Sequence, residues 1–205
     1  MAFVTDEHRQ RIRAAIEAAE RRTRGEFVTV IARESDDYLY IPILWAALIS
    51  LAIPGLAQLS LVPWLVMHTY SIQVVAFVLI AVLFRLPAIK HRLIPKYVQR
   101  QRAHQIALEQ FFLQNLHGTA ERTGVLLFVS VAEHYVEIIA DSGINDKVKE
   151  DAWTEIVAEF VKRVKSREIA EGFLTAVVAC GQLLSAHFPR REDDRNELPN
   201  RLIEI

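Results

Sequence analysis

The sequence of 205 residues has a single cysteine, Cys180, and almost no net charge. One cysteine excludes an internal disulfide framework and any zinc site built from cysteines alone. The 24 lysines and arginines are balanced by 25 aspartates and glutamates, which gives a formal charge of -1. Because binding to a phosphate backbone normally requires a clear basic excess, we expect no nucleic-acid partner.

The signatures of several common enzyme classes are also missing. The chain has no G-x-S-x-G elbow, no G-x-x-x-x-G-K-[ST] loop, no G-x-G-x-x-G turn and no H-E-x-x-H helix. Its seven histidines are scattered. Ser130 and Ser142 have no activating base nearby in the sequence, and a base supplied by a distant segment stays open.

The segment Tyr38 to Phe84 contains no lysine, arginine, aspartate or glutamate. One helical membrane span needs about 20 apolar residues, so this segment accommodates two. Gln58 to Pro63 interrupts the apolar run and predicts a turn. We therefore expect a transmembrane hairpin with spans at about 40–57 and 64–84, with a kink or an early end of the first span at Pro54-Gly55.

Positive charges on both sides of the hairpin set its predicted orientation. They are Arg21, Arg22, Arg24 and Arg33 before it, and Arg85, Lys90, Arg92, Lys96, Arg100 and Arg102 after it. The turn between the spans carries none. By the positive-inside rule, the chain is predicted to be a multi-pass protein of the inner membrane with both termini in the cytoplasm.

Aromatic side chains stand near both ends of the uncharged segment. Tyr38, Tyr40 and Trp45 lie at one boundary, and Trp64 and Tyr70 lie toward the other. Such residues suit the two membrane interfaces, although aromatic side chains that simply face the lipid would explain these positions equally well. The alternative for the whole segment, the buried core of a soluble helical protein, is disfavoured because such cores rarely extend this far without a charge.

The polar remainder alternates between helix and strand periodicity. Before the hairpin we expect a helix over Thr5–Arg24 and a strand over Glu26–Ala32. After it we expect a helix at Lys96–Leu116, strands at Gly124–Val131 and His134–Ala140, helices at Asn145–Val164 and Arg167–His187, and a charged tail from Pro189 with little to bury.

The strands must share one sheet, because a lone strand before the hairpin is not stable. Strands on opposite sides of a membrane cannot pair, so the number of spans between them must be even. A right-handed crossover makes Glu26–Ala32 parallel to Gly124–Val131. The short turn at Ala132-Glu133 makes His134–Ala140 antiparallel to its neighbour.

Several segments resemble the TPM domain family, in its bacterial membrane-anchored branch. They are Glu121 to His134 (ERTGVLLFVSVAEH), Val136 to Ile144 (VEIIADSGI), Arg24-Gly25-Glu26, Trp153, Glu171-Gly172-Phe173 and Asn196-Glu197-Leu198-Pro199. The resemblance implies an α/β/α sandwich into which the two-helix transmembrane hairpin is inserted. Residues 1–37 and 87–188 then form the domain, 38–86 the hairpin and 189–205 the charged tail.

The resemblance also carries functional expectations. It implies metal binding by acidic side chains in some relatives, weak acid phosphatase activity in a plant relative, and accessory roles in membrane complexes. Many relatives have an N-terminal signal and one C-terminal anchor, which place the domain outside the cytoplasm. This sequence departs from that arrangement, which puts an extracytoplasmic role and calcium as the natural ion in doubt.

Three acidic residues form the candidate metal site. Asp141 ends the last strand, Asp146 follows at the next helix, and Glu26 begins the first strand at the same edge of the sheet. Hard cations such as Mg²⁺ or Ca²⁺ take oxygen ligands of this kind, and a bound ion could polarise a phosphate. The alternative is that Asp141 and Asp146 are turn and capping residues and that Glu26 is solvated.

Two functions follow from these observations. The first is a binding or accessory module anchored in the lipid bilayer, with a membrane or peripheral protein as its partner at the cytoplasmic face. The second is a metal-dependent phosphatase acting on phosphate esters. The absence of catalytic motifs favours the first.

Overall fold

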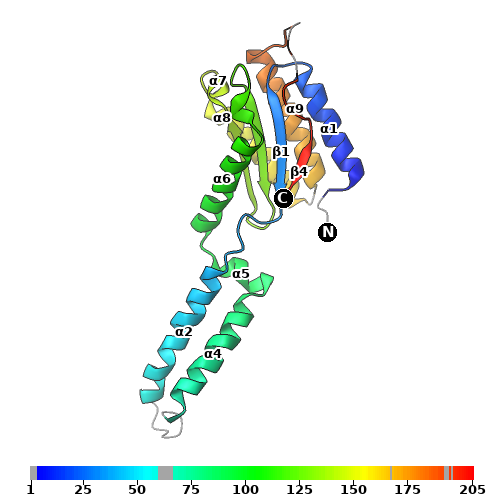
Figure 1. Cartoon of the computed structure of the whole chain (residues 1–205). Helices are drawn as coiled ribbons and strands as arrows, with labels where there is room; N and C mark the ends of the chain where they lie inside the picture. Colours follow the sequence, from blue (N-terminus) through cyan, green and yellow to red (C-terminus); the bar gives the residue numbers. More distant parts are fainter. Residues whose placement is uncertain (1–3, 60–66, 167, 192–193, 195) are drawn as a thin grey trace. The chain divides into compact units, whose positions relative to one another are not determined.

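The computed structural model describes residues 4–59, 67–166, 168–191, 194 and 196–205 (Figure 1). The chain divides into two compact units. Met1–Ser35 and Gln101–Ile205 form the first, a mixed α/β domain, and Asp36–Arg100 form the second, which is helical.

The α/β domain contains a four-stranded sheet in the order β3-β2-β1-β4. β1 (Glu26–Ala32) is parallel to β2 (Gly124–Ser130) along its whole length, with Glu26 opposite Gly124 and Ala32 opposite Ser130. β3 (Tyr135–Ala140) is antiparallel to β2. The predicted strands, their common sheet and their relative directions are confirmed.

The C-terminal segment differs from the prediction of a tail with little to bury. Leu202–Glu204 forms β4, which is parallel to β1 and pairs Val30 with Ile203. The composition of the segment does not indicate this strand, because charged residues precede its short apolar stretch, Leu202-Ile203. The missed strand covers the edge of β1 that would otherwise expose unpaired backbone groups.

Both faces of the sheet are covered by helices (Figure 1). On one face, Phe27 and Ile31 belong to a core with α1 (Asp6–Glu20), α8 (Glu150–Lys165) and α9 (Ile169–His187). On the other face, α6 (Lys96–Leu113) contributes Ala103, Ala107 and Phe111 to a second core. Alternating β1 and β2 residues supply the two cores, because successive strand side chains point to opposite faces.

The ends of the helices follow local sequence signals. Thr5 caps α1, since its hydroxyl accepts a hydrogen bond from the His8 N–H at 3.3 Å. The helix predicted to begin at Asn145 begins instead at Glu150, because Asp141 caps a separate short helix, α7 (Ser142–Asn145). A 3-10 turn, η1 (Leu116–Gly118), leads toward β2.

The helical unit contains α2 (Tyr40–Leu59), α4 (Thr69–Phe84) and α5 (Pro87–Leu93), of which α2 and α4 lie side by side (Figure 1). α2 continues through Pro54, so of the two alternatives at Pro54-Gly55, a kink or an early end of the helix, the early end is wrong. Part of the predicted turn, Ser60–Pro63, and the predicted start of the second span at Trp64 lie outside the described residues. Tyr38, expected at a membrane interface, is fully buried against Ile41 and Ile94.

Two described helices, α2 and α9, are long and apolar enough to cross a membrane by length and composition, and α4 is apolar but shorter. Their surroundings differ. α9 buries Phe173, Val177, Cys180 and Leu184 in the core beside the sheet. α2 leaves much of its apolar surface exposed, for example at Leu51 and Leu56.

Candidate functional site

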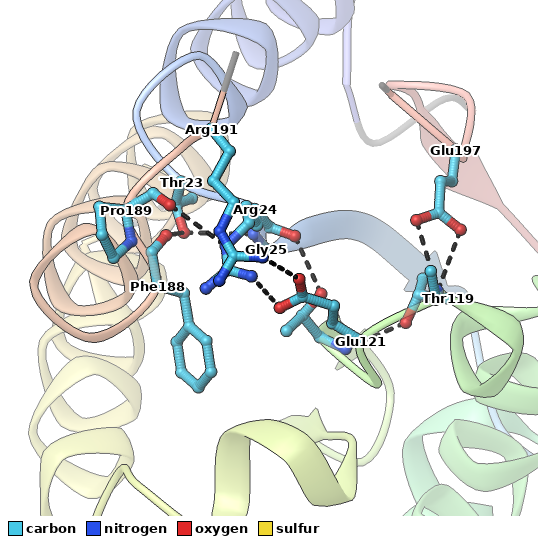
Figure 2. Close-up of polar contacts among 11 residues, drawn as sticks. Thr23, Arg24, Gly25, Thr119, Glu121, Phe188, Pro189, Arg191 and Glu197 are labelled. Atoms are coloured by element: carbon cyan, nitrogen blue, oxygen red, sulfur yellow. Dashed lines mark hydrogen bonds and ion pairs between the residues drawn. The ribbon is translucent and has the colours of Figure 1, made fainter. Parts of the chain in front are cut away.

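The end of the sheet at which β1 and β2 begin holds a group of polar contacts between distant segments of the chain. Three segments meet there: the turn from α1 into β1, the loop before β2 and the chain after α9 (Figure 2). Thr23 donates a hydrogen bond to the Phe188 carbonyl at 2.7 Å, and Thr123 donates one to the Arg24 carbonyl at 2.9 Å. The turn is therefore fixed from both sides.

Glu20 and Glu26 are both buried at this end, with 8% and 5% of their surface exposed. Glu20 ends α1 and accepts hydrogen bonds from the Phe27 N–H at 3.0 Å and from the side-chain amides of Asn196 and Asn200. Glu26 accepts hydrogen bonds from the backbone N–H groups of Glu197, at 3.1 Å, and Leu198, at 3.2 Å. The two carboxyl groups thus hold the segment that leads into β4.

Burial changes the acidity of both groups. Loss of hydration raises the pKa of Glu20 to about 8 despite the opposing hydrogen bond from Phe27, and the charge of Glu26 adds to the rise. Loss of hydration also raises the pKa of Glu26, against the two backbone hydrogen bonds that favour its ionised form. The pair lines a cavity of about 230 Å³ together with Glu17, Arg21, Thr23, Arg190, Asp194, Asn196 and Asn200.

Beside this cavity, Arg24 and Arg191 both bind the carboxylate of Glu121 (Figure 2). Arg191 Nη1 lies 3.2 Å from Glu121 Oε1, and Arg24 also donates to the Pro189 carbonyl at 3.2 Å. The Ala120 N–H donates to Glu197 at 3.2 Å. These contacts add a second set of links between the loop before β2 and the C-terminal segment.

The structure gives the three predicted metal ligands different surroundings. Glu26 is engaged by the backbone of Glu197 and Leu198. Asp141 caps α7 by accepting a hydrogen bond from the Ser142 N–H at 2.7 Å, and its other oxygen lies 3.6 Å from Arg122 Nη1. Asp146 is exposed at the end of α7.

The sheet order explains why these residues do not gather. Asp141 donates its N–H to the Gly124 carbonyl, and Gly124 is in register with Glu26, so β2 lies between the two acidic residues. Two strand spacings of roughly 4.8 Å each separate their backbones. Within the described residues, no group of three or more His, Cys, Asp or Glu side chains is placed to hold a metal ion. A Mg²⁺ or Ca²⁺ ion at this edge stays a prediction, as does the hydrolysis of phosphate esters.

Sequence reasoning missed Glu20, Glu121 and the C-terminal asparagines as members of this site. One signal was available for Glu20: Ile12 and Ile16 precede it at a spacing of four residues, which puts it on the buried face of α1. The partners of Glu20, Asn196 and Asn200, lie too far along the chain for any spacing rule to connect them.

The raised pKa of Glu20 makes stability depend on pH. Because folding raises this pKa from 4.5 to about 8, the folded chain binds the proton more tightly than the unfolded chain does. The resulting stabilisation of the folded state is complete at a pH below 4.5 and is lost as the pH rises through about 8. We expect the melting temperature to fall over this interval, and to fall much less in Glu20→Gln, whose amide mimics the protonated acid.

Glu17→Gln is the comparison variant, since Glu17 lines the same cavity, is not buried and contributes least among the groups that shift the pKa of Glu20. It should keep most of the slope of the unmodified protein when melting temperature is followed by circular dichroism. An equally steep loss of stability in Glu20→Gln would show that Glu20 is not the titrating group.

Comparison with known proteins agrees with this fold. Residues 91–183 match the family model described as the TPM domain, and no curated protein matches the sequence. The NMR structure of the BA42 protein from the psychrophilic bacterium Bizionia argentinensis is similar, with a TM-score of 0.64 and 20% sequence identity over 100% of this chain and 97% of that chain. At this identity the likeness concerns the fold alone. The resemblance noted in the sequence is thus confirmed by the match of residues 91–183 to the TPM domain model.

Proposed function

We propose that the chain is anchored in the inner membrane by α2 and α4 and that its TPM domain is a binding module at the cytoplasmic face. The observation that carries the anchoring is the exposed apolar surface of these helices. The exposed side chains include Leu44, Leu48, Leu51, Leu56, Val74, Val78, Leu79 and Val82. A contiguous apolar surface of this kind is rare in monomeric soluble proteins and typical of lipid contact.

Lengths and strand pairing support a hairpin rather than one span. α2 has 20 residues and a rise of about 1.5 Å per residue, which matches a hydrocarbon core of about 30 Å. The parallel pairing of β1 with β2 requires both strands on the same side of the membrane, so a chain that crosses through α2 must return before Gly124. α4 provides the return.

α9 is not a span in this proposal. Its apolar residues already have partners in the core, where Phe173 packs against Phe160 with ring centroids 5.1 Å apart. Removing α9 from the domain would expose the face of the sheet that it covers together with α1 and α8.

The binding role is favoured because the acidic groups at the end of the sheet where β1 and β2 begin already have structural partners. Glu20, Glu26 and Glu121 hold the C-terminal segment, and Asp141 caps a helix. Side chains held in these structural hydrogen bonds are poorly placed to move a proton in a reaction. A partner protein at the membrane surface would instead contact the solvent-exposed surface of the domain.

Cysteine labelling tests the anchoring and the orientation. Cys180 is 1% exposed, and burial raises the pKa of its thiol to about 12, so the native cysteine is protected. We expect a membrane-impermeant maleimide to label Met67→Cys in intact cells, because Met67 is 82% exposed and precedes α4. Glu7→Cys, at an exposed position of α1, should be labelled only after lysis. Labelling of Glu7→Cys in intact cells would overturn the cytoplasmic placement.

Quantitative co-purification tests the binding role. Phe128→Ala removes a fully buried ring from the domain core, should cost about 3–5 kcal/mol of folding free energy, and leaves α2 and α4 untouched. We expect a partner recovered from gently solubilised membranes with the unmodified chain to be depleted in this variant. Gly55→Ala is the control, since an added Cβ in α2 meets nothing within 4 Å. Equal recovery with all three chains would contradict a binding role for the domain.

A further inference from the structure

The α/β domain contains a cavity of about 530 Å³ at the end of the sheet opposite to Glu26. Its walls come from the end of β2, the turn into β3, the last turns of α8 and the start of α9. The residues that line it are Val129, Ser130, Val131, His134, Tyr135, Val136, Val161, Val164, Lys165 and Ile169. All of them belong to the unit that contains the sheet.

The cavity continues the core on the α8 and α9 face of the sheet. Val129 is a buried member of that core, and Val131, Val136, Val164 and Ile169 are partly buried residues packed against it. Protein interiors are normally filled to crystal-like density. An apolar space of this size is instead typical of a site that receives a ligand, since such sites measure roughly 300–1,000 Å³ and are mostly apolar.

Among the described residues that line the cavity, Lys165 carries a formal charge, and that charge is positive. Lys165, in the last turn of α8, is exposed, and no acidic side chain among the described residues pairs with it. His134 also lines the cavity, in the left-handed backbone region at φ 53°. A charge of the lysine type at the border of an apolar cavity favours an anionic ligand.

The acidic groups near the cavity are already engaged. Glu133 accepts hydrogen bonds from the Ser35 N–H at 3.0 Å and from the Ser130 hydroxyl. Glu168, at the start of α9, lies 3.8 Å from Arg163. Glu159, six residues before Lys165 in α8, lies near Lys162 and Arg163. Among the described residues that line the cavity, the ammonium group of Lys165 is therefore the charge available to a ligand.

We propose that this cavity binds a single-chain fatty carboxylate. The valine and isoleucine walls receive the acyl chain, and Lys165 binds the carboxylate. Burial of the methylene groups stabilises the bound chain, and the ammonium supplies selectivity for an acid over a neutral head group. The site depends on the domain alone and is independent of the proposed anchoring.

Photolabelling of the full chain in lipid nanodiscs tests the site. The probe is a dodecanoate that carries a diazirine near the end of its chain, with a diazirine-bearing dodecanol as the neutral counterpart. We expect the acid to label peptides from α8 and the β2–β3 turn, with unlabelled dodecanoate competing. Label on α2 and α4 measures general partition into the bilayer and serves as the internal reference.

Two pairs of variants separate the cavity from non-specific binding. Lys165→Gln should lower cavity labelling by the acid about tenfold and leave labelling by the alcohol unchanged, because only the acid uses the ammonium. Lys162→Gln, on the same turn but outside the cavity, should have no effect. Val161→Trp should block both probes by filling the space, whereas Val178→Trp, on the exposed side of α9, should block neither.

The result that overturns the proposal is equally specific. Labelling confined to α2 and α4, or cavity labelling that is unchanged in Lys165→Gln and in Val161→Trp, would exclude a fatty carboxylate site. Equal losses for acid and alcohol in Lys165→Gln would exclude the ammonium as the group that binds the carboxylate. Failure of Val161→Trp to fold would leave the decision to Lys165→Gln.

Discussion

β1 and β2 pair in parallel from Glu26 opposite Gly124 to Ala32 opposite Ser130, although the whole helical unit lies between them in the sequence. Both strands are buried along their full length and supply the two cores of the domain. Every other layer rests on this pair: β3 and β4 extend it at the two edges, and helices cover both faces. An insertion between these strands that crosses a membrane must therefore return the chain to the side of the membrane on which β1 lies. A helical hairpin does this.

The C-terminal segment completes the domain through buried polar contacts. Two buried glutamates, Glu20 and Glu26, accept hydrogen bonds from residues 196–200, and β4 then pairs with β1. Buried acidic groups are costly unless they are hydrogen-bonded or protonated, and these are hydrogen-bonded and have raised pKa values. Glu20 and Glu26 therefore help to hold the C-terminal segment in the fold, and a cation at this end of the sheet stays a prediction.

Much of the fold could be predicted from local patterns. β1 was predicted with its observed bounds, and the first helix of the hairpin, expected at about 40–57, extends over Tyr40–Leu59. Periodicity and uncharged length are properties of short windows, so one sequence reveals them. The parallel direction of β1 and β2 followed from the handedness of crossover connections.

The remaining features depend on contacts between distant segments. β4 has three residues, too few for a periodicity, and it forms because β1 offers a free edge. The convergence of Glu26, Asp141 and Asp146 was inferred from the end of the sheet that they share, but the intervening β2 keeps the first two apart. Glu20 and the cavity beside Lys165 arise from packing between elements, which residue spacing does not encode.

The most direct test of this account is to replace residues 40–93 by a flexible linker of about ten glycines and serines. If α2 and α4 are the anchor and the β1–β2 pair holds the domain together, the shortened chain should leave the membrane fraction. It should also unfold cooperatively and retain amide protection in both strands. A chain that stays in the membrane would show that another segment, foremost α9, is the anchor, and a chain without protected strands would contradict a domain that the hairpin merely interrupts.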